Sequence, residues 1–293
     1  MTRKKQFYSL RSRLTLMVVT VVIFPMLLAT LSAFFSQKEQ INRSLTRELN
    51  ASLSACILYY QNLQGKLEMM TLATANDNTC KTTLRLGVLP QLQKQLKSLA
   101  QNYRMDFLLA TDLSGKVVAL YPPATDSDID LNQHPLISRA LQGNEITTTL
   151  QEHVPLLIRA TTTPTEDDKQ KTTLLLESAM PIKIRNTQIG TILAGIRLSN
   201  NNELMQTMQQ ASGADRTALV MNSEIVAASY QPVNLVKNNL LDTLNSLQSP
   251  VPESLAIVTC PLDKKQKVFK WSNIIGINKE PVAALITILD YDR

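Results

Sequence analysis

The sequence is poor in the residue types from which catalytic and metal sites are usually built. It has two histidines, His134 and His153, among 293 residues. Two histidines leave few ways to assemble a zinc site or a Ser/His/Asp arrangement. The eight glycines are scattered between Gly65 and Gly276, so the sequence has no glycine-rich loop that could cradle a phosphate. We therefore expect a protein that is not an enzyme, with no catalytic residue, no cofactor and no metal.

Cysteine is too scarce and too scattered for a disulfide scaffold, since Cys56, Cys80 and Cys260 are the three in the chain. In an oxidising compartment Cys56 can pair with Cys80. The other interpretation is that both are small buried apolar residues. The sequence leaves both interpretations open.

Charge of one sign is concentrated at the N-terminus. Residues 1–13 contain no acidic residue and five of the 30 basic ones, namely Arg3, Lys4, Lys5, Arg11 and Arg13. The rest of the chain is nearly neutral, with 25 basic and 24 acidic residues. A nucleic-acid-binding protein would carry its basic excess on the folded domain. We therefore expect no nucleic-acid partner.

An uncharged apolar run of 22 residues follows, from Leu14 to Phe35. About 20 apolar residues cross the hydrocarbon core of a bilayer as a helix, whereas a signal peptide has an apolar core of about 7–15 residues. We expect an uncleaved transmembrane helix over residues 14–36, with a kink at Pro25. Basic residues stay on the cytoplasmic side, so residues 1–13 are expected inside and the chain after Gln37 outside.

A long helix is predicted to continue from this span. Between Gln37 and Thr74 there is no proline, and apolar or small residues recur in steps of three or four: Ile41, Leu45, Leu49, Leu53, Cys56, Tyr60, Leu63, Leu67, Met70 and Thr74. This face must be buried, either against the domain that follows or against the same helix in a homodimer. Both remain open, and both can hold along different stretches.

The pattern changes from helical to strand-like near residue 105. A second helix is expected over 90–103, after which the chain predicts strands at 105–112 and 116–122, a helix at 132–141, and antiparallel strands at 154–163, 172–184 and 188–198, with 164–171 as a hairpin loop. The following residues repeat this plan: helix 201–212, strands 217–221 and 224–228, helix 235–247, and strands 254–259, 268–272 and 282–289. We expect an α+β fold with a helical stalk over 37–104 and two lobes, 105–200 and 201–293, each with an antiparallel sheet.

Several short motifs in this order resemble a known family. They are Asp112-Leu-Ser-Gly115, Tyr121-Pro122, His134-Pro135 through Gly143, Ala179-Met-Pro181, and Ile189-Gly190 with Ala194-Gly195-Ile196. The chain resembles the double Cache, PAS-like sensor domains of bacterial transmembrane receptors such as two-component sensor kinases. The resemblance implies a single-pass protein of the bacterial inner membrane with a periplasmic sensor domain. It also implies that a small molecule binds in the membrane-distal first lobe and acts through the long helix.

Polar residues on otherwise apolar strands are the candidate ligand contacts. Arg159, in the stretch PLLIRATTT, suits a carboxylate ligand through paired hydrogen bonds. Glu177 and Ser178 are adjacent in the stretch LLLESAMP, so one of the two can face the pocket. The resemblance adds Tyr121, His134 and Arg139, on the loop and helix that cover the pocket in that family.

These residues and this function also have simpler interpretations. Arg159 and Glu177 can form a cross-strand pair on a solvent face, and His134 can be only the residue that starts a helix. The chain can also be a membrane-tethered binding or assembly protein without signalling output. No second apolar span and no output domain follow the last strand, so we expect either a truncated receptor or a sensor that works through a separate partner.

Overall fold

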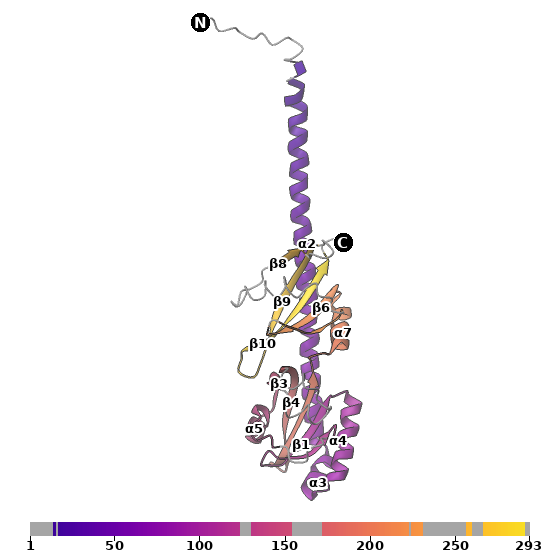
Figure 1. Cartoon of the computed structure of the whole chain (residues 1–293), viewed down its shortest axis with the longest axis vertical. Coiled ribbons are helices and arrows are strands. Elements are labelled where there is room, and N and C mark those ends of the chain that lie inside the picture. Colours follow the sequence, from indigo (N-terminus) through magenta and orange to yellow (C-terminus); the bar gives the residue numbers. More distant parts are fainter. Residues whose placement is uncertain are drawn as a thin grey trace. The chain divides into compact units, whose positions relative to one another are not determined.

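The computed structural model describes residues 14–290, apart from residues 16, 124–129, 154–171, 223, 231–255 and 260–265. The chain divides into two compact units, Met1–Glu48 and Leu49–Arg293. Figure 1 labels most of the helices and strands. The candidate site and both sheets lie in the second unit.

The described part of the first unit is helical, and it is apolar up to Phe35. A π-helical segment, η1 (Val19–Ile23), leads into the helix α2 (Phe24–Asn76), which runs past Glu48 into the second unit. The most apolar 18-residue window of this helix has a mean hydropathy of 2.1 and no buried residue, so it is a candidate membrane span by length and composition. The π-helical segment ends two residues before Pro25, and the kink expected at this proline stays a prediction.

The periodic face of α2 packs on its own domain along the second unit. Leu49, Leu53, Cys56 and Leu67 are buried there, and Tyr60 is partly buried against the same core. Along this stretch the periodic face is therefore buried against the domain that follows, so the first of the two interpretations holds. The rest of this face, where Ile41 is 49% exposed, and the other sides of the helix stay available to a homodimer.

The first lobe opens with two helices, α3 (Asn78–Leu86) and α4 (Leu89–Tyr103). The Asp77 side chain accepts a hydrogen bond from the Cys80 N–H at the start of α3, and Gly87, in the left-handed conformation, ends it. The strands of this lobe are β1 (Phe107–Thr111), β2 (Val117–Tyr121), β3 (Ile146–His153), β4 (Thr172–Ile184) and β5 (Thr187–Arg197), with α5 (Pro135–Leu141) between β2 and β3. They form one antiparallel sheet in the order β2-β1-β5-β4-β3.

The second lobe repeats this sheet topology. It contains α7 (Asn202–Ser212), β6 (Arg216–Met221), β7 (Glu224–Ala228), β8 (Ala256–Thr259), β9 (Gln266–Ile275) and β10 (Pro281–Asp290). Its antiparallel order, β7-β6-β10-β9-β8, is that of the first sheet with each strand replaced by its counterpart. The predicted α+β class with two sheets is confirmed. The helix expected at 235–247 lies outside the described residues.

One strand of the first lobe differs from the sequence prediction. β3 occupies Ile146–His153, a stretch for which we predicted no strand. Its sequence, ITTTLQEH, has few apolar residues, and its place in the sheet comes from pairing with β4 along its whole length. The strand expected at 154–163 and the loop expected at 164–171 lie outside the described residues.

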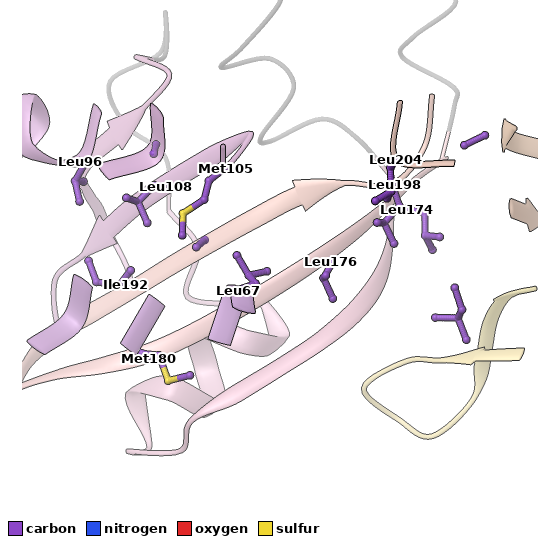
Figure 2. Packing of buried hydrophobic residues seen from close by; sticks show 14 of the residues in the cluster. Leu67, Leu96, Met105, Leu108, Leu174, Leu176, Met180, Ile192, Leu198 and Leu204 are labelled. Atoms are coloured by element: carbon purple, nitrogen blue, oxygen red, sulfur yellow. The ribbon is translucent and has the colours of Figure 1, made fainter. Parts of the chain in front are cut away.

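The first sheet is covered on both faces. On one face, Leu108, Leu176 and Ile192 join a core with Leu67 of α2 and Leu96 of α4; Figure 2 shows part of this cluster. On the other face, buried residues of β1, β4 and β5 pack with those of α5: Leu109, Leu175, Ala179, Leu193, Leu136, Ile137 and Ala140. We call these the α2 face and the α5 face.

The cysteine question is settled for two of the three thiols. Cys56 and Cys80 are both free and fully buried, so they do not pair. Burial, helped by the nearby charge of Asp77, raises the pKa of the Cys80 thiol to about 12. Burial raises the pKa of Cys56 as well. Both act as small apolar core residues, since the thiolate that reacts is disfavoured at neutral pH.

Gly195 on β5 marks the tightest packing on the α5 face. A Cβ at this position would lie 2.0 Å from Cζ of Phe107, its partner on β1, so the aromatic ring covers the glycine. Only a residue without a side chain fits under the ring.

We predict that Gly195→Ala lowers the free energy of unfolding by about 1–3 kcal/mol, because the added methyl displaces the Phe107 ring. Urea denaturation of the full chain in detergent measures this. Gly65→Ala is the matched control, since no atom lies within 4 Å of its added methyl. That control should be neutral or stabilise α2 by up to about 1 kcal/mol. Equal effects at both glycines would contradict the packing.

Candidate functional site

Strand β4 presents two adjacent polar residues to opposite faces of the first sheet. Glu177 lies between Leu175 and Ala179, which both belong to the α5-face cluster. Ser178 lies between positions of the α2-face cluster, and its hydroxyl accepts a hydrogen bond from the Thr147 hydroxyl at 2.9 Å. These opposite orientations agree with the prediction that only one of Glu177 and Ser178 can face a given pocket, because successive residues of a strand point to opposite faces.

Glu177 forms a buried pair with His134. The distance from His134 Nε2 to Glu177 Oε2 is 3.3 Å, and the two side chains are 6% and 0% exposed. His134 is the residue that precedes the first turn of α5, so the start of this helix places its ring over β4. His134 therefore does more than start a helix, because its side chain also lies next to the Glu177 carboxylate.

Glu177 lies in a row of four paired residues across the sheet. Thr148 of β3, Glu177 of β4, Gly195 of β5 and Phe107 of β1 are successive partners in the strand register. The Phe107 ring covers Gly195, which is the strand neighbour of Glu177 in this row. A carboxylate beside an aromatic ring and an imidazole is suited to bind the ammonium group of a ligand.

Glu177 is the one acidic residue that is buried among those the structure describes. Placing a carboxylate in such surroundings costs several kcal/mol unless a partner and hydrogen bonds compensate for the lost hydration. A purely structural role could be filled by an apolar side chain at lower cost. The position therefore fits a binding residue better than a packing residue.

The other predicted site residues do not gather around Glu177. Tyr121 ends β2 and packs, half-buried, against the α2-face core, and Arg139 is exposed on α5. Ser178 faces the α2 side, as described above. Arg159 lies outside the described residues, so its role as a carboxylate anchor remains a prediction. The alternative of a solvent-face cross-strand pair with Glu177 is wrong, because Glu177 is fully buried and its cross-strand partners are Thr148 and Gly195.

The α2 face of the same strands is linked to the long helix by hydrogen bonds. Gln64 Nε2 of α2 donates to the Thr147 carbonyl at 3.1 Å, and the hydroxyls of Tyr60 and Thr149 share a hydrogen bond. Burial raises the pKa of Tyr60, so its hydroxyl stays protonated and able to donate. Thr149 also forms a β-bridge with Gly276, in the turn between β9 and β10 of the second lobe.

These contacts were not predicted from the sequence. Thr147, Thr148 and Thr149 are three similar residues in a row, and only the strand register assigns each to a face. Tyr60 was predicted only as part of the apolar helix face. The signal available in the sequence was the polar run itself, which is unusual in a strand with both faces covered.

Two described cavities lie away from the α5 face. A groove of about 680 Å³ is lined by α2, the end of β5 and the start of α7, including Tyr59, Arg104 and Glu203. A second groove of about 500 Å³ lies between α3 and the turn that joins β4 to β5. Within the described residues, no group of three or more His, Cys, Asp or Glu side chains is placed to hold a metal ion.

Comparison with known proteins gives a consistent result. The family model described as LuxQ, periplasmic, matches residues 91–259. No curated protein shows significant sequence similarity to the chain.

Solved structures share the fold at low sequence identity. The periplasmic domain of Vibrio cholerae LuxQ aligns with a TM-score of 0.56 and 11% identity, over 83% of this chain and 98% of that one. The ligand-binding domain of the Pseudomonas fluorescens chemoreceptor CtaA, in complex with L-serine, aligns with a TM-score of 0.54 and 17% identity, over 86% of this chain and 100% of that one. The sensory domain of the Campylobacter jejuni chemoreceptor Tlp3, with isoleucine bound, aligns with a TM-score of 0.54 and 14% identity, over 88% of this chain and 96% of that one.

We predict that removing one residue of the buried pair costs more stability than replacing both. We expect Glu177→Leu to lower the free energy of unfolding by about 3–5 kcal/mol, because it leaves His134 without its acidic partner. The double variant with His134→Leu should recover part of the loss, since two apolar residues need no polar partner in this core. Urea denaturation measures both. A loss below about 1 kcal/mol for Glu177→Leu, typical of exposed pairs, would contradict the burial.

Proposed function

The chain belongs to the family of LuxQ periplasmic domains, and we propose that it is the ligand-sensing part of a transmembrane receptor, with the α5 face of the first lobe as its binding surface. The family assignment makes it a periplasmic sensor domain, and the apolar N-terminal helix supports a single-pass membrane anchor. Our proposal adds the cytoplasmic orientation of residues 1–13, which rests on their basic charge.

The ligand we propose is a small α-amino acid or a related amino carboxylate. Glu177, with His134 and the Phe107 ring beside it, would hold the ammonium group. Arg159 would hold the carboxylate by paired hydrogen bonds. The similar chemoreceptor domains that contain L-serine or isoleucine support this ligand class. The single observation that carries the proposal is the burial of Glu177 in an otherwise apolar sheet face.

The signal would pass through β3. Thr148 lies on the α5 face, where the ligand binds, while Thr147 and Thr149 contact Gln64 and Tyr60 of α2 on the opposite face. A shift of this strand on ligand binding would therefore move its contacts with the helix directly. For signalling, the ligand must bind one arrangement of these contacts more tightly, and about 1.4 kcal/mol of difference gives a tenfold population shift.

Ligand binding is tested with the purified full chain. We expect at least one α-amino acid to raise its melting temperature, and Glu177→Gln and Arg159→Ala each to abolish this shift. Isothermal titration calorimetry with the same compounds measures the affinity independently of the melting temperature. Glu224→Gln, an exposed acid of the second lobe, is the control and should bind normally. Unchanged binding by Glu177→Gln would overturn the proposed site.

We further propose that two copies associate through α2. From Leu49 onward its apolar periodic face is already buried in the chain, but Leu58 and Met69 are 57% and 71% exposed. They are eleven residues apart, which is close to three helical turns, so they lie on one side of the helix. This side offers an apolar contact for a second copy without disturbing the core.

The homodimer is tested by charge substitution on that side. We expect Leu58→Glu with Met69→Glu to shift the full chain from dimer to monomer in light scattering, because two buried acids in each copy would repel. Leu58→Met with Met69→Leu, which keeps both side chains apolar, should leave the dimer intact. A monomeric wild-type chain, or a dimer that survives the double substitution, would contradict this interface.

A further inference from the structure

The groove between α3 and the β4–β5 turn is lined by basic residues. Lys81 and Arg85 line it from α3, Arg185 lines it from the turn, and Lys183 lines it from the end of β4. The Lys183 ammonium lies 3.9 Å from the position of a Cβ built on Gly143, so it is next to the end of α5 rather than between the walls of the groove. Asn78 and Thr82 of α3 complete the polar lining, and no lining residue is acidic. Lys81, Arg85 and Arg185 are a marked concentration of cations, because the chain after residue 13 has 25 basic and 24 acidic residues.

The fold places these cations on two sides of the groove, on α3 and on the β4–β5 hairpin. Lys81 and Arg85 are four residues apart on α3 and therefore share one side of the helix. Arg185 and Asn186 form the two-residue turn between β4 and β5, with φ angles of +49° and +68°, as a tight hairpin requires. The turn places Arg185 opposite the helix without depending on a flexible loop.

Within the part of the chain that the structure describes, none of Lys81, Arg85 and Arg185 forms an ion pair with an acid, and Lys81 donates instead to the Asn76 side-chain oxygen at 3.1 Å. Like charges on facing walls repel one another, and an anion between them would relieve that repulsion. Guanidinium groups match the oxygens of phosphate in pairs, and lysine adds point charge.

We propose that this groove is a second ligand site, which binds a soluble polyanion with neighbouring phosphate groups. Its volume of about 500 Å³ lies in the range of small-ligand sites. It is distinct from the α5-face site: Lys183 and Glu177 are six residues apart on β4, which is about 20 Å along an extended strand. A ligand here would tie α3 to the edge of the sheet. The proposal does not depend on which molecule the first site binds.

Titration of the full chain, in neutral detergent at low salt, with pyrophosphate tests the site. We expect saturable binding that is tighter than that of inorganic phosphate and weakens as salt is raised, since the ionic contacts are screened. Arg85→Gln and Arg185→Asn should each weaken binding about tenfold. Both variants suit their local backbone, because glutamine favours helices and asparagine tolerates a positive φ.

A matched control separates a built site from general charge attraction. Lys94→Gln and Lys97→Gln remove the same charge from exposed positions of α4 outside the groove, and they should not change pyrophosphate affinity. Equal weakening by control and groove variants, or no binding by the wild-type chain, would overturn the proposal. Tighter binding of citrate would overturn the phosphate assignment. Binding only to vesicles of phosphatidylcholine with phosphatidic acid, and not to soluble pyrophosphate, would overturn the soluble ligand.

Discussion

The alternation of side chains along β3 and β4 is the constraint on which the site depends. Both faces of the first sheet are covered, one by α2 and α4 and the other by α5, so each residue of these strands belongs to one of two interiors. Glu177 is held in the α5-side interior with His134, and its neighbour Ser178 is held on the α2 side with Thr147. A one-residue slip in register would exchange the two and place the acid against the long helix.

The same alternation gives β3 contacts on both faces of the sheet. Thr148 shares a face with Glu177, while its two neighbours contact α2, and Thr149 also meets the second lobe at Gly276. A Cβ at Gly276 would lie 2.6 Å from Cγ1 of Val282, so the turn approaches β10 closely at this point. One strand therefore touches the proposed ligand surface, the helix and the second lobe. The basic groove at the other end of β4 adds a second place where a ligand could bias the same sheet.

Much of the fold was accessible from the sequence. The apolar run, the unbroken periodicity of the long helix and the repeated strand order predicted a helical anchor and two antiparallel lobes, and the resemblance to double Cache sensors is confirmed by the family match and the shared fold. β3 was missed because its Thr-rich sequence lacks the apolar alternation of a covered strand, and its pairing with β4 decides its conformation. The pairing of His134 with Glu177 was also missed, since the two are far apart in the chain.

By itself the sequence determined most of the elements, their order and the residue types available for chemistry. The scarcity of histidine, cysteine and glycine and the neutral charge of the folded part are properties of composition, and helix and strand periodicity are local. Only the tertiary structure decided which face each residue occupies. It buried the periodic side of α2 from Leu49 onward against its own domain, kept Cys56 and Cys80 apart, and brought together Lys81 and Arg85 of a helix with Arg185 of a hairpin turn. The physical reason is that burial and pairing depend on contacts between residues distant in the chain, which local patterns do not encode.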